Sequence, residues 1–141
     1  MPQEVGLRGS VFLVDTSVWI EVFRKPSRFR LESVAELEEV ATCLPVIQEV
    51  LQGFREESAF RIAREAMYAL PVVESPLRRE AFDQSVSLYR QARNAGLTPR
   101  SGVDCLIAAC ALMNDLTVLH YDRDIDLLAQ VSSLRTRRIR F

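Results

Sequence analysis

Residues 11–23, VFLVDTSVWIEVF, decide the fold of this 141-residue chain. The first four residues are all apolar and predict a buried strand, and the apolar stretch that resumes after Ser17 predicts a short helix carrying the single tryptophan, Trp19. Asp15 stands at the joint between the two elements. Aspartate is a good helix-capping residue, and so is Thr16, so this stretch taken alone favours capping as the role of Asp15.

Apolar runs and helix-breaking residues alternate along the rest of the chain. Helices are predicted between the strands, one of them over residues 30–41. The predicted strands are 11–14, 42–46, 71–74, 116–121 and 136–141. Several of them are too apolar to face water, which favours an α/β fold with a mainly parallel sheet covered on both faces. Ligands of such folds bind beyond the carboxyl ends of the strands.

The length of the chain fits one domain, which we expect over residues 11–141. A flexible N-terminal extension is expected at residues 1–10. This segment lacks the apolar centre of a signal peptide, so the expected compartment is the cytoplasm.

Four acidic residues lie at or near the predicted carboxyl edge of the sheet. Asp15 and Asp122 each follow an apolar strand. Asp104 lies within GVDCLIAACALM, which is apolar on nearly every face of a helix, so its carboxylate would need a cation or hydrogen-bond donors nearby. An equal alternative for Asp104 is a first-turn aspartate favoured by the helix dipole. Glu49 lies on the flank of an apolar helix face, where a surface position is the simpler explanation.

Two more acids, Asp124 and Asp126, follow Asp122 in the segment DRDID. A calcium-binding loop is excluded, because Leu127 and Ser133 stand where that loop needs glycine and glutamate. We expect Asp124 or Asp126 to cap the next helix, which leaves Asp122 free to act as a ligand.

The four carboxylates at one edge of the sheet would repel one another unless a divalent cation neutralised them. Oxygen ligands without histidine or thiolate indicate Mg²⁺, with Mn²⁺ as the alternative. The chemistry predicted for such a site is phosphodiester hydrolysis.

Four segments, VDTSVW, PVIQEVLQG, SGVDCLIAACAL and HYDRDIDLLA, follow one another in an order that resembles the PIN-domain ribonucleases, in particular the VapC toxins of prokaryotic toxin–antitoxin pairs. The likeness covers about residues 11–130 and implies a three-layer α/β/α domain. It implies that the catalytic and metal-binding acids are Asp15, Glu49, Asp104 and Asp122. Residues expected to support these ligands are Thr16, Ser17 and Asp124.

The resemblance also implies metal-dependent endonucleolytic cleavage of RNA, a homodimer, and a small antitoxin whose tail enters the groove and blocks the site. DNA would be contacted only through the antitoxin, and no membrane partner is expected. A second interpretation remains open, in which the chain is a catalytically silent PIN-fold binding module that acts only in a complex with its antitoxin and DNA. The presence of all four acids favours the enzyme.

Arginine is the main basic residue of the chain, since Lys25 is the only lysine among 18 basic residues. The formal net charge of −1 excludes a uniformly basic coat for nucleic acid. Arg100 and Arg123 lie next to two of the expected ligands and are predicted to hold phosphates of the substrate. Tyr121 is a candidate for stacking on an unpaired base, whereas Trp19 is expected to pack in the core or in a dimer contact.

Overall fold

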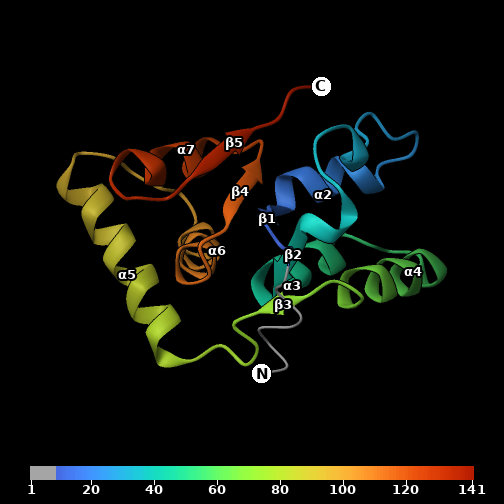
Figure 1. Cartoon of the computed structure of the whole chain (residues 1–141), viewed down its shortest axis with the longest axis horizontal. Coiled ribbons are helices and arrows are strands. Elements are labelled where there is room, and N and C mark those ends of the chain that lie inside the picture. Colours follow the sequence, from blue (N-terminus) through green and yellow to red (C-terminus); the bar gives the residue numbers. More distant parts are fainter. Residues whose placement is uncertain (1–8) are drawn as a thin grey trace.

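The computed structural model describes residues 9–141, and a five-stranded sheet lies at its centre (Figure 1). The strand order is β3-β2-β1-β4-β5, and every neighbouring pair is parallel. The strands are β1 (Phe12–Val14), β2 (Val40–Cys43), β3 (Val72–Val73), β4 (Thr117–His120) and β5 (Thr136–Arg138). Their carboxyl ends all lie at one edge of the sheet, as the sequence predicts for an α/β fold.

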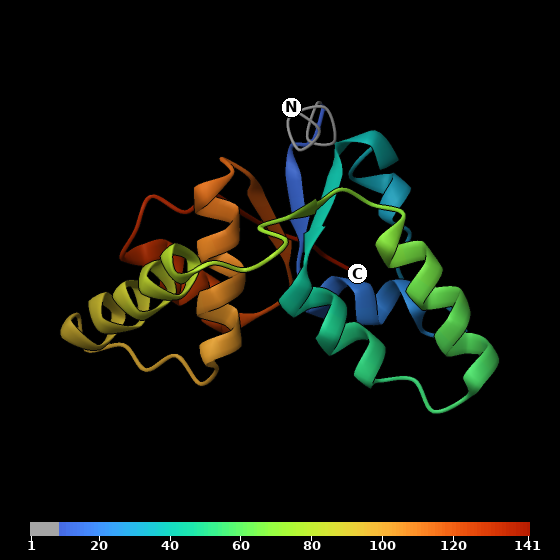
Figure 2. The same ribbon diagram turned by 90° about the horizontal axis from the view of Figure 1, so that it is seen from below.

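Helices cover both faces of the sheet. Within the described part of the chain they are α2 (Thr16–Phe23), α3 (Leu44–Gln52), α4 (Glu57–Tyr68), α5 (Arg79–Asn94), α6 (Gly102–Met113) and α7 (Arg123–Gln130). Figure 2 shows α5, α6 and α7 on one side of the sheet and α2, α3 and α4 on the other. This arrangement confirms the predicted three-layer α/β/α architecture.

The central position of β1 explains why residues 11–14, VFLV, are all apolar. Phe12 is in register with Val40 of β2 on one side and with Thr117 of β4 on the other. Leu13 and Val14 are fully buried. A strand between two parallel neighbours, with helices over both faces, has no side exposed to water, so both sets of side chains are apolar.

The helix predicted over residues 30–41 is wrong. The segment forms two short 3-10 turns, η1 (Leu31–Ser33) and η2 (Leu37–Glu39), and its last residues belong to β2. Val40 and Ala41 pair with β1 and are fully buried. Sheet pairing and burial therefore outweigh the helix propensity of this glutamate-rich segment.

The sequence predicts a flexible N-terminal extension and no membrane partner. Of the flexible extension expected at residues 1–10, residues 1–8 lie outside the described residues, and the extension stays a prediction. No helix among residues 9–141 combines the length and the apolar character needed to cross a lipid bilayer.

Candidate active site

A cavity of about 250 Å³ opens at the carboxyl edge of the sheet. All four acids expected to hold a metal line it, although they come from different elements: the β1–α2 junction, α3, α6 and the β4–α7 junction. The lining residues are Asp15, Thr16, Ser17, Ile20, Glu49, Ser101, Asp104 and Asp122. The topology of the parallel sheet thus gathers carboxylates that are far apart in the sequence.

Asp15 both caps a helix and faces this cavity. Its Oδ2 accepts hydrogen bonds from the backbone N–H of Ser17 at 3.1 Å and from the Ser17 hydroxyl at 2.5 Å, so it is the N-cap of α2. Its Oδ1 is buried and has no hydrogen-bond partner among the described residues. Burial raises the pKa of Asp15 to about 6, against the opposing effect of the Ser17 hydrogen bonds. The cap uses one oxygen, and the other remains available to a cation.

Two hydroxyls next to Asp15 orient the site. The Thr16 hydroxyl donates to Glu49 Oε1 at 2.7 Å, which fixes a side chain 33 residues away. The Ser17 hydroxyl, besides donating to Asp15, accepts a hydrogen bond from the Tyr121 backbone N–H at 2.9 Å. These contacts tie α2 to α3 and to the end of β4, so the cavity walls are held by side chains of the DTS segment.

Asp104 lies in the first turn of α6, and its side chain is buried where it lines the cavity. Burial is the main cause that raises the pKa of Asp104 to about 8, and the neighbouring charges of Asp122, Asp15 and Asp124 raise it further. Ser101 occupies the N-cap position of α6, but its side chain makes no capping hydrogen bond. Without a cation, this carboxyl group favours its protonated form at neutral pH.

The end of β4 differs from the sequence prediction in one respect. Asp122, and not Asp124 or Asp126, caps α7, because its Oδ1 accepts from the Asp124 backbone N–H at 2.8 Å. Asp124 instead turns back, and its Oδ2 accepts from the Arg100 backbone N–H at 2.8 Å. Carboxylate oxygens of Asp104, Asp122 and Asp124 all lie within 4.8 Å of one another. Asp124, expected to support the ligands, therefore lies within ligand distance of Asp104 and Asp122, although it does not line the cavity.

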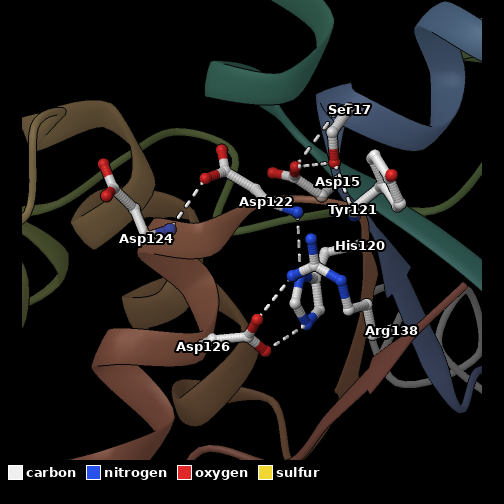
Figure 3. Close-up of polar contacts among 8 residues, drawn as sticks. All are labelled: Asp15, Ser17, His120, Tyr121, Asp122, Asp124, Asp126 and Arg138. Atoms are coloured by element: carbon white, nitrogen blue, oxygen red, sulfur yellow. Dashed lines mark hydrogen bonds and ion pairs between the residues drawn. The ribbon is translucent and has the colours of Figure 1, made fainter.

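Asp126 points away from this acidic group, toward His120 and Arg138 (Figure 3). The fully buried His120 accepts a hydrogen bond at Nδ1 from the Asp122 backbone N–H, 3.1 Å away. Burial lowers the pKa of His120, which agrees with a neutral ring that carries its proton on Nε2. The only signal of His120 in the sequence is that it is a polar residue at the end of an apolar predicted strand, two positions before Asp122.

The two arginines expected to hold phosphates lie at the margin of the site. Arg100 has its Nε 3.7 Å from Asp124 Oδ1, and its side chain is 69% exposed. Arg123 is exposed at the start of α7. Neither side chain lines the cavity. Trp19 is buried and stacks on Phe23, so it packs in the core as expected.

The donor set of the cavity fits a divalent cation. All the acidic donors are oxygen atoms, and two of them, Asp15 Oδ1 and Asp124 Oδ1, are buried without a hydrogen-bond partner among the described residues. The carboxylates of Asp104, Asp122 and Asp124 crowd together. The pKa values of Asp15 and Asp104 are raised. A positive ion would remove the repulsion that this arrangement creates. The residues that could hold it are Asp15, Glu49, Asp104, Asp122 and Asp124.

Comparisons with known proteins give one consistent family. Residues 12–131 match the family model of the PIN domain. Ribonuclease VapC11 of Mycobacterium tuberculosis (strain ATCC 25618 / H37Rv) is 33% identical over 135 residues, which cover 92% of this chain and 100% of that protein. Of solved structures, VapBC-5 from Mycobacterium tuberculosis matches with a TM-score of 0.70 at 20% identity, over 92% of this chain and 99% of that chain. DNA-bound VapBC from Salmonella typhimurium matches with a TM-score of 0.72 at 18% identity, over 92% and 98%.

Proposed function

Because this chain belongs to the VapC ribonucleases of the PIN-domain family, we propose that it is a metal-dependent endoribonuclease and the toxin of a toxin–antitoxin pair. The observation that carries the proposal is the cavity at the carboxyl edge of the sheet, where acids from separate elements converge. Helix capping accounts for one oxygen of Asp15 and one of Asp122, but it does not explain why four carboxylates from separate elements line one cavity. Metal-dependent phosphodiester hydrolysis needs such a cluster to hold its cation.

The proposed cofactor is Mg²⁺, with Mn²⁺ as the alternative. When bound, the ion would supply the positive charge that activates a water molecule and stabilises the phosphodiester in its transition state. The carboxylates proposed to hold it are Asp15, Glu49, Asp104 and Asp122, with Asp124 close enough to join them.

The remaining polar groups of the site would position these ligands and the substrate. Thr16 holds the Glu49 carboxylate, and Ser17 holds one oxygen of Asp15, so neither acid is free to rotate away from the cavity. Arg100 and Arg123 are exposed beside the acidic group, where guanidinium groups can contact phosphates of a bound strand.

A small antitoxin is the proposed protein partner. An apolar groove of about 260 Å³ adjoins the cavity, and Ile20 lines both. The residues of the groove are Ile20, Phe23, Arg24, Val50, Gly53 and Phe54. A segment with apolar side chains followed by a basic one would complement the groove and the acidic cavity together, and would block the site. DNA would be bound through the antitoxin.

A homodimer in the cytoplasm is the proposed state of the free toxin. Phe82, Val86 and Tyr89 form an exposed apolar stripe on one face of α5, which fits a contact with a second copy. The three cysteines are free and buried, which suits a reducing compartment.

The test is cleavage of purified RNA by the antitoxin-free protein with Mg²⁺, with Mn²⁺ or with a chelator. We expect discrete fragments that need the metal and disappear in the Asp104→Asn variant. The matched control is Asp83→Asn, which neutralises an exposed aspartate on α5 and should cleave as the parent does.

Identical fragments from the parent and from Asp104→Asn would contradict the proposal, because contaminating nuclease would then explain the cleavage. Absence of cleavage with either metal would favour the silent binding module, which acts only with its antitoxin and DNA.

A further inference from the structure

Two aromatic rings lie half exposed next to the acidic cavity. The centroids of Tyr121 and Phe141 are 4.8 Å apart with an interplanar angle of 58°, and the residues are 48% and 49% exposed. Phe29, which is buried, contacts the Phe141 ring edge-on at 5.8 Å and anchors it. The C-terminal segment after β5, the red end of the ribbon in Figure 1, therefore runs toward the segment that follows α2, where Phe29 lies.

Arginines stack on both rings. The guanidinium carbon of Arg28 lies 5.5 Å from the centroid of Phe141, and that of Arg138 lies 4.8 Å from the centroid of Tyr121. Each arginine is also paired with an acid, Arg28 with Glu21 and Arg138 with Asp126. The ion pairs hold the guanidinium groups in place, while the arginine side chains remain 55% and 44% exposed. We call Tyr121, Phe141, Arg28 and Arg138 the aromatic platform.

The aromatic platform is joined directly to the cavity. Tyr121 immediately precedes Asp122, and its backbone N–H donates to Ser17, which in turn holds Asp15 (Figure 3). Arg140, exposed in the same segment as Phe141, forms no ion pair within residues 9–141, so it adds positive charge beside the rings. A strand whose phosphate occupies the acidic cavity would therefore pass over or beside these rings.

We propose that the aromatic platform binds an unpaired nucleotide of the RNA substrate, by stacking of its base on Tyr121 or Phe141 and by contact of its phosphate with the adjoining arginines. This inference rests on the proposed ribonuclease function and adds how the substrate is held. Every base has a π face, so stacking accepts many sequences. It requires a base that is not already stacked in a helix, which selects single-stranded segments, loops and bulges over duplex RNA. Half-exposed rings with arginine beside them are the usual components of such a surface.

The experiment measures binding of a short fluorescein-labelled single-stranded RNA, and of a duplex of the same length, by fluorescence anisotropy in chelator, where no metal-dependent cleavage occurs. We expect Tyr121→Ala and Phe141→Ala each to bind the single strand about tenfold more weakly than the parent. Binding of the duplex should not change. Tyr121→Trp keeps a stacking surface and should bind the single strand at least as tightly as the parent.

The chain offers a matched control in Tyr68 on α4, which is 47% exposed and carries the Arg64 guanidinium 5.0 Å from its ring centroid. Tyr68→Ala removes the same chemistry from a place outside the site and should bind RNA as the parent does. Thermal melting of each variant establishes that it is folded.

Four results would overturn the proposal: no binding of the single strand by the parent, unchanged binding by Tyr121→Ala, an equal loss for duplex and single strand, or a Tyr121→Trp variant as weak as Tyr121→Ala. If RNA binding by Tyr121→Ala is unchanged but its molecular mass in solution differs from that of the parent, the rings belong to a contact between copies. Metal-dependent cleavage by the parent is scored separately. If the parent cuts RNA but the variants bind it normally, the proposed role of the aromatic platform is wrong and the ribonuclease function stands. If the variants lose binding but the parent never cuts RNA, the ribonuclease function is wrong and the role of the aromatic platform stands.

Discussion

At the scale of single residues, two acids of the cavity, Asp104 and Asp15, are held in surroundings that oppose their ionisation. Burial raises the pKa of Asp104 to about 8 and that of Asp15 to about 6, and the charges of neighbouring acids add to both shifts. Asp15 shows how one side chain can serve two purposes, because Oδ2 caps α2 and Oδ1 faces the cavity without a partner. The site is therefore strained electrostatically until a cation binds.

Replacing Asp104 should stabilise the metal-free protein, and increasingly so as the pH rises. The pKa of Asp104 is about 8 in the folded protein against the ordinary value of 3.8, so the folded state binds the proton in a window where the unfolded chain releases it. The free energy of unfolding of the parent then falls by about 1.4 kcal/mol per pH unit for this carboxyl as the pH rises through the window. Asp104→Asn lacks this loss, so its stability relative to the parent should increase between about pH 5 and about pH 8. Urea denaturation in chelator measures the difference.

Asp83→Asn is the control for this experiment, because Asp83 is exposed on α5. Its stability relative to the parent should not increase with pH as that of Asp104→Asn does. Saturating Mg²⁺ should reverse the order of stabilities, because binding to the folded state stabilises the parent and the variant has lost a ligand. If Asp104→Asn is less stable than the parent in chelator both at about pH 5 and at about pH 8, Asp104 is a structural residue and the proposed metal site is wrong.

At the scale of elements, three of the four acids that line the cavity lie at the starts of helices. α2 begins at the Asp15 cap directly after β1, and α7 begins at the Asp122 cap, one residue beyond the end of β4. α6 begins without a side-chain cap at Ser101 and places Asp104 in its first turn. Aspartate at the first turn or N-cap suits the positive end of the helix dipole, and the three helix starts meet at one edge of the sheet. Capping and ligand binding therefore use the same residue type at the same place.

Two substitutions of Asp122 should separate capping from metal binding. Asparagine caps a helix about as well as aspartate, whereas alanine does not, so Asp122→Ala should be about 1 kcal/mol less stable than Asp122→Asn. Both variants lose the carboxylate, and both should lose metal-dependent cleavage. Urea denaturation in chelator compares their stabilities, and the RNA assay compares their activities.

Ser101→Ala is the matched control for Asp122→Ala, because Ser101 stands at a cap position without a capping hydrogen bond. Its effect on the free energy of unfolding should stay within about 0.5 kcal/mol. Equal stabilities of Asp122→Asn and Asp122→Ala would show that the hydrogen bond from the Asp124 backbone N–H contributes nothing to α7.

At the scale of the whole molecule, the site depends on the central position of β1. This strand pairs with β2 and β4, and its end sets Asp15 against the residues that follow β4. The backbone N–H of Asp15 donates to the Leu119 carbonyl at 2.9 Å, which fixes the distance between the two strand ends. Helix layers on both faces bury the strand.

Removing side-chain volume from β1 should destabilise the whole domain. Leu13 is fully buried between the two helix layers, so Leu13→Ala should lower the free energy of unfolding by about 2–5 kcal/mol. Leu37→Ala removes the same atoms from a residue that is 67% exposed, and it should change stability by less than about 0.5 kcal/mol. Chemical denaturation of the two variants measures both effects. Similar values for Leu13→Ala and Leu37→Ala would mean that β1 is not the centre of the core.

The sequence by itself determined the class of fold and the position of two of the acids, because both follow from local patterns. Continuous apolar runs such as VFLV indicate buried parallel strands, and an acid directly after such a run lies at the carboxyl edge of the sheet wherever the strand is placed. Asp15 and Asp122 were found in this way, and the structure brings both into one cavity with Glu49 and Asp104.

Only the tertiary structure decided which of these residues does what, because contacts between distant parts of the chain set the direction of each side chain. Asp124 turns toward the backbone of Arg100, 24 residues away, and so leaves the capping of α7 to Asp122. Val40 and Ala41 belong to a segment whose local propensity is helical, but they form a strand because they pair with β1. The rings of Tyr121 and Phe141 meet because β4 and β5 are neighbours in the sheet, and no periodicity in the sequence encodes that approach.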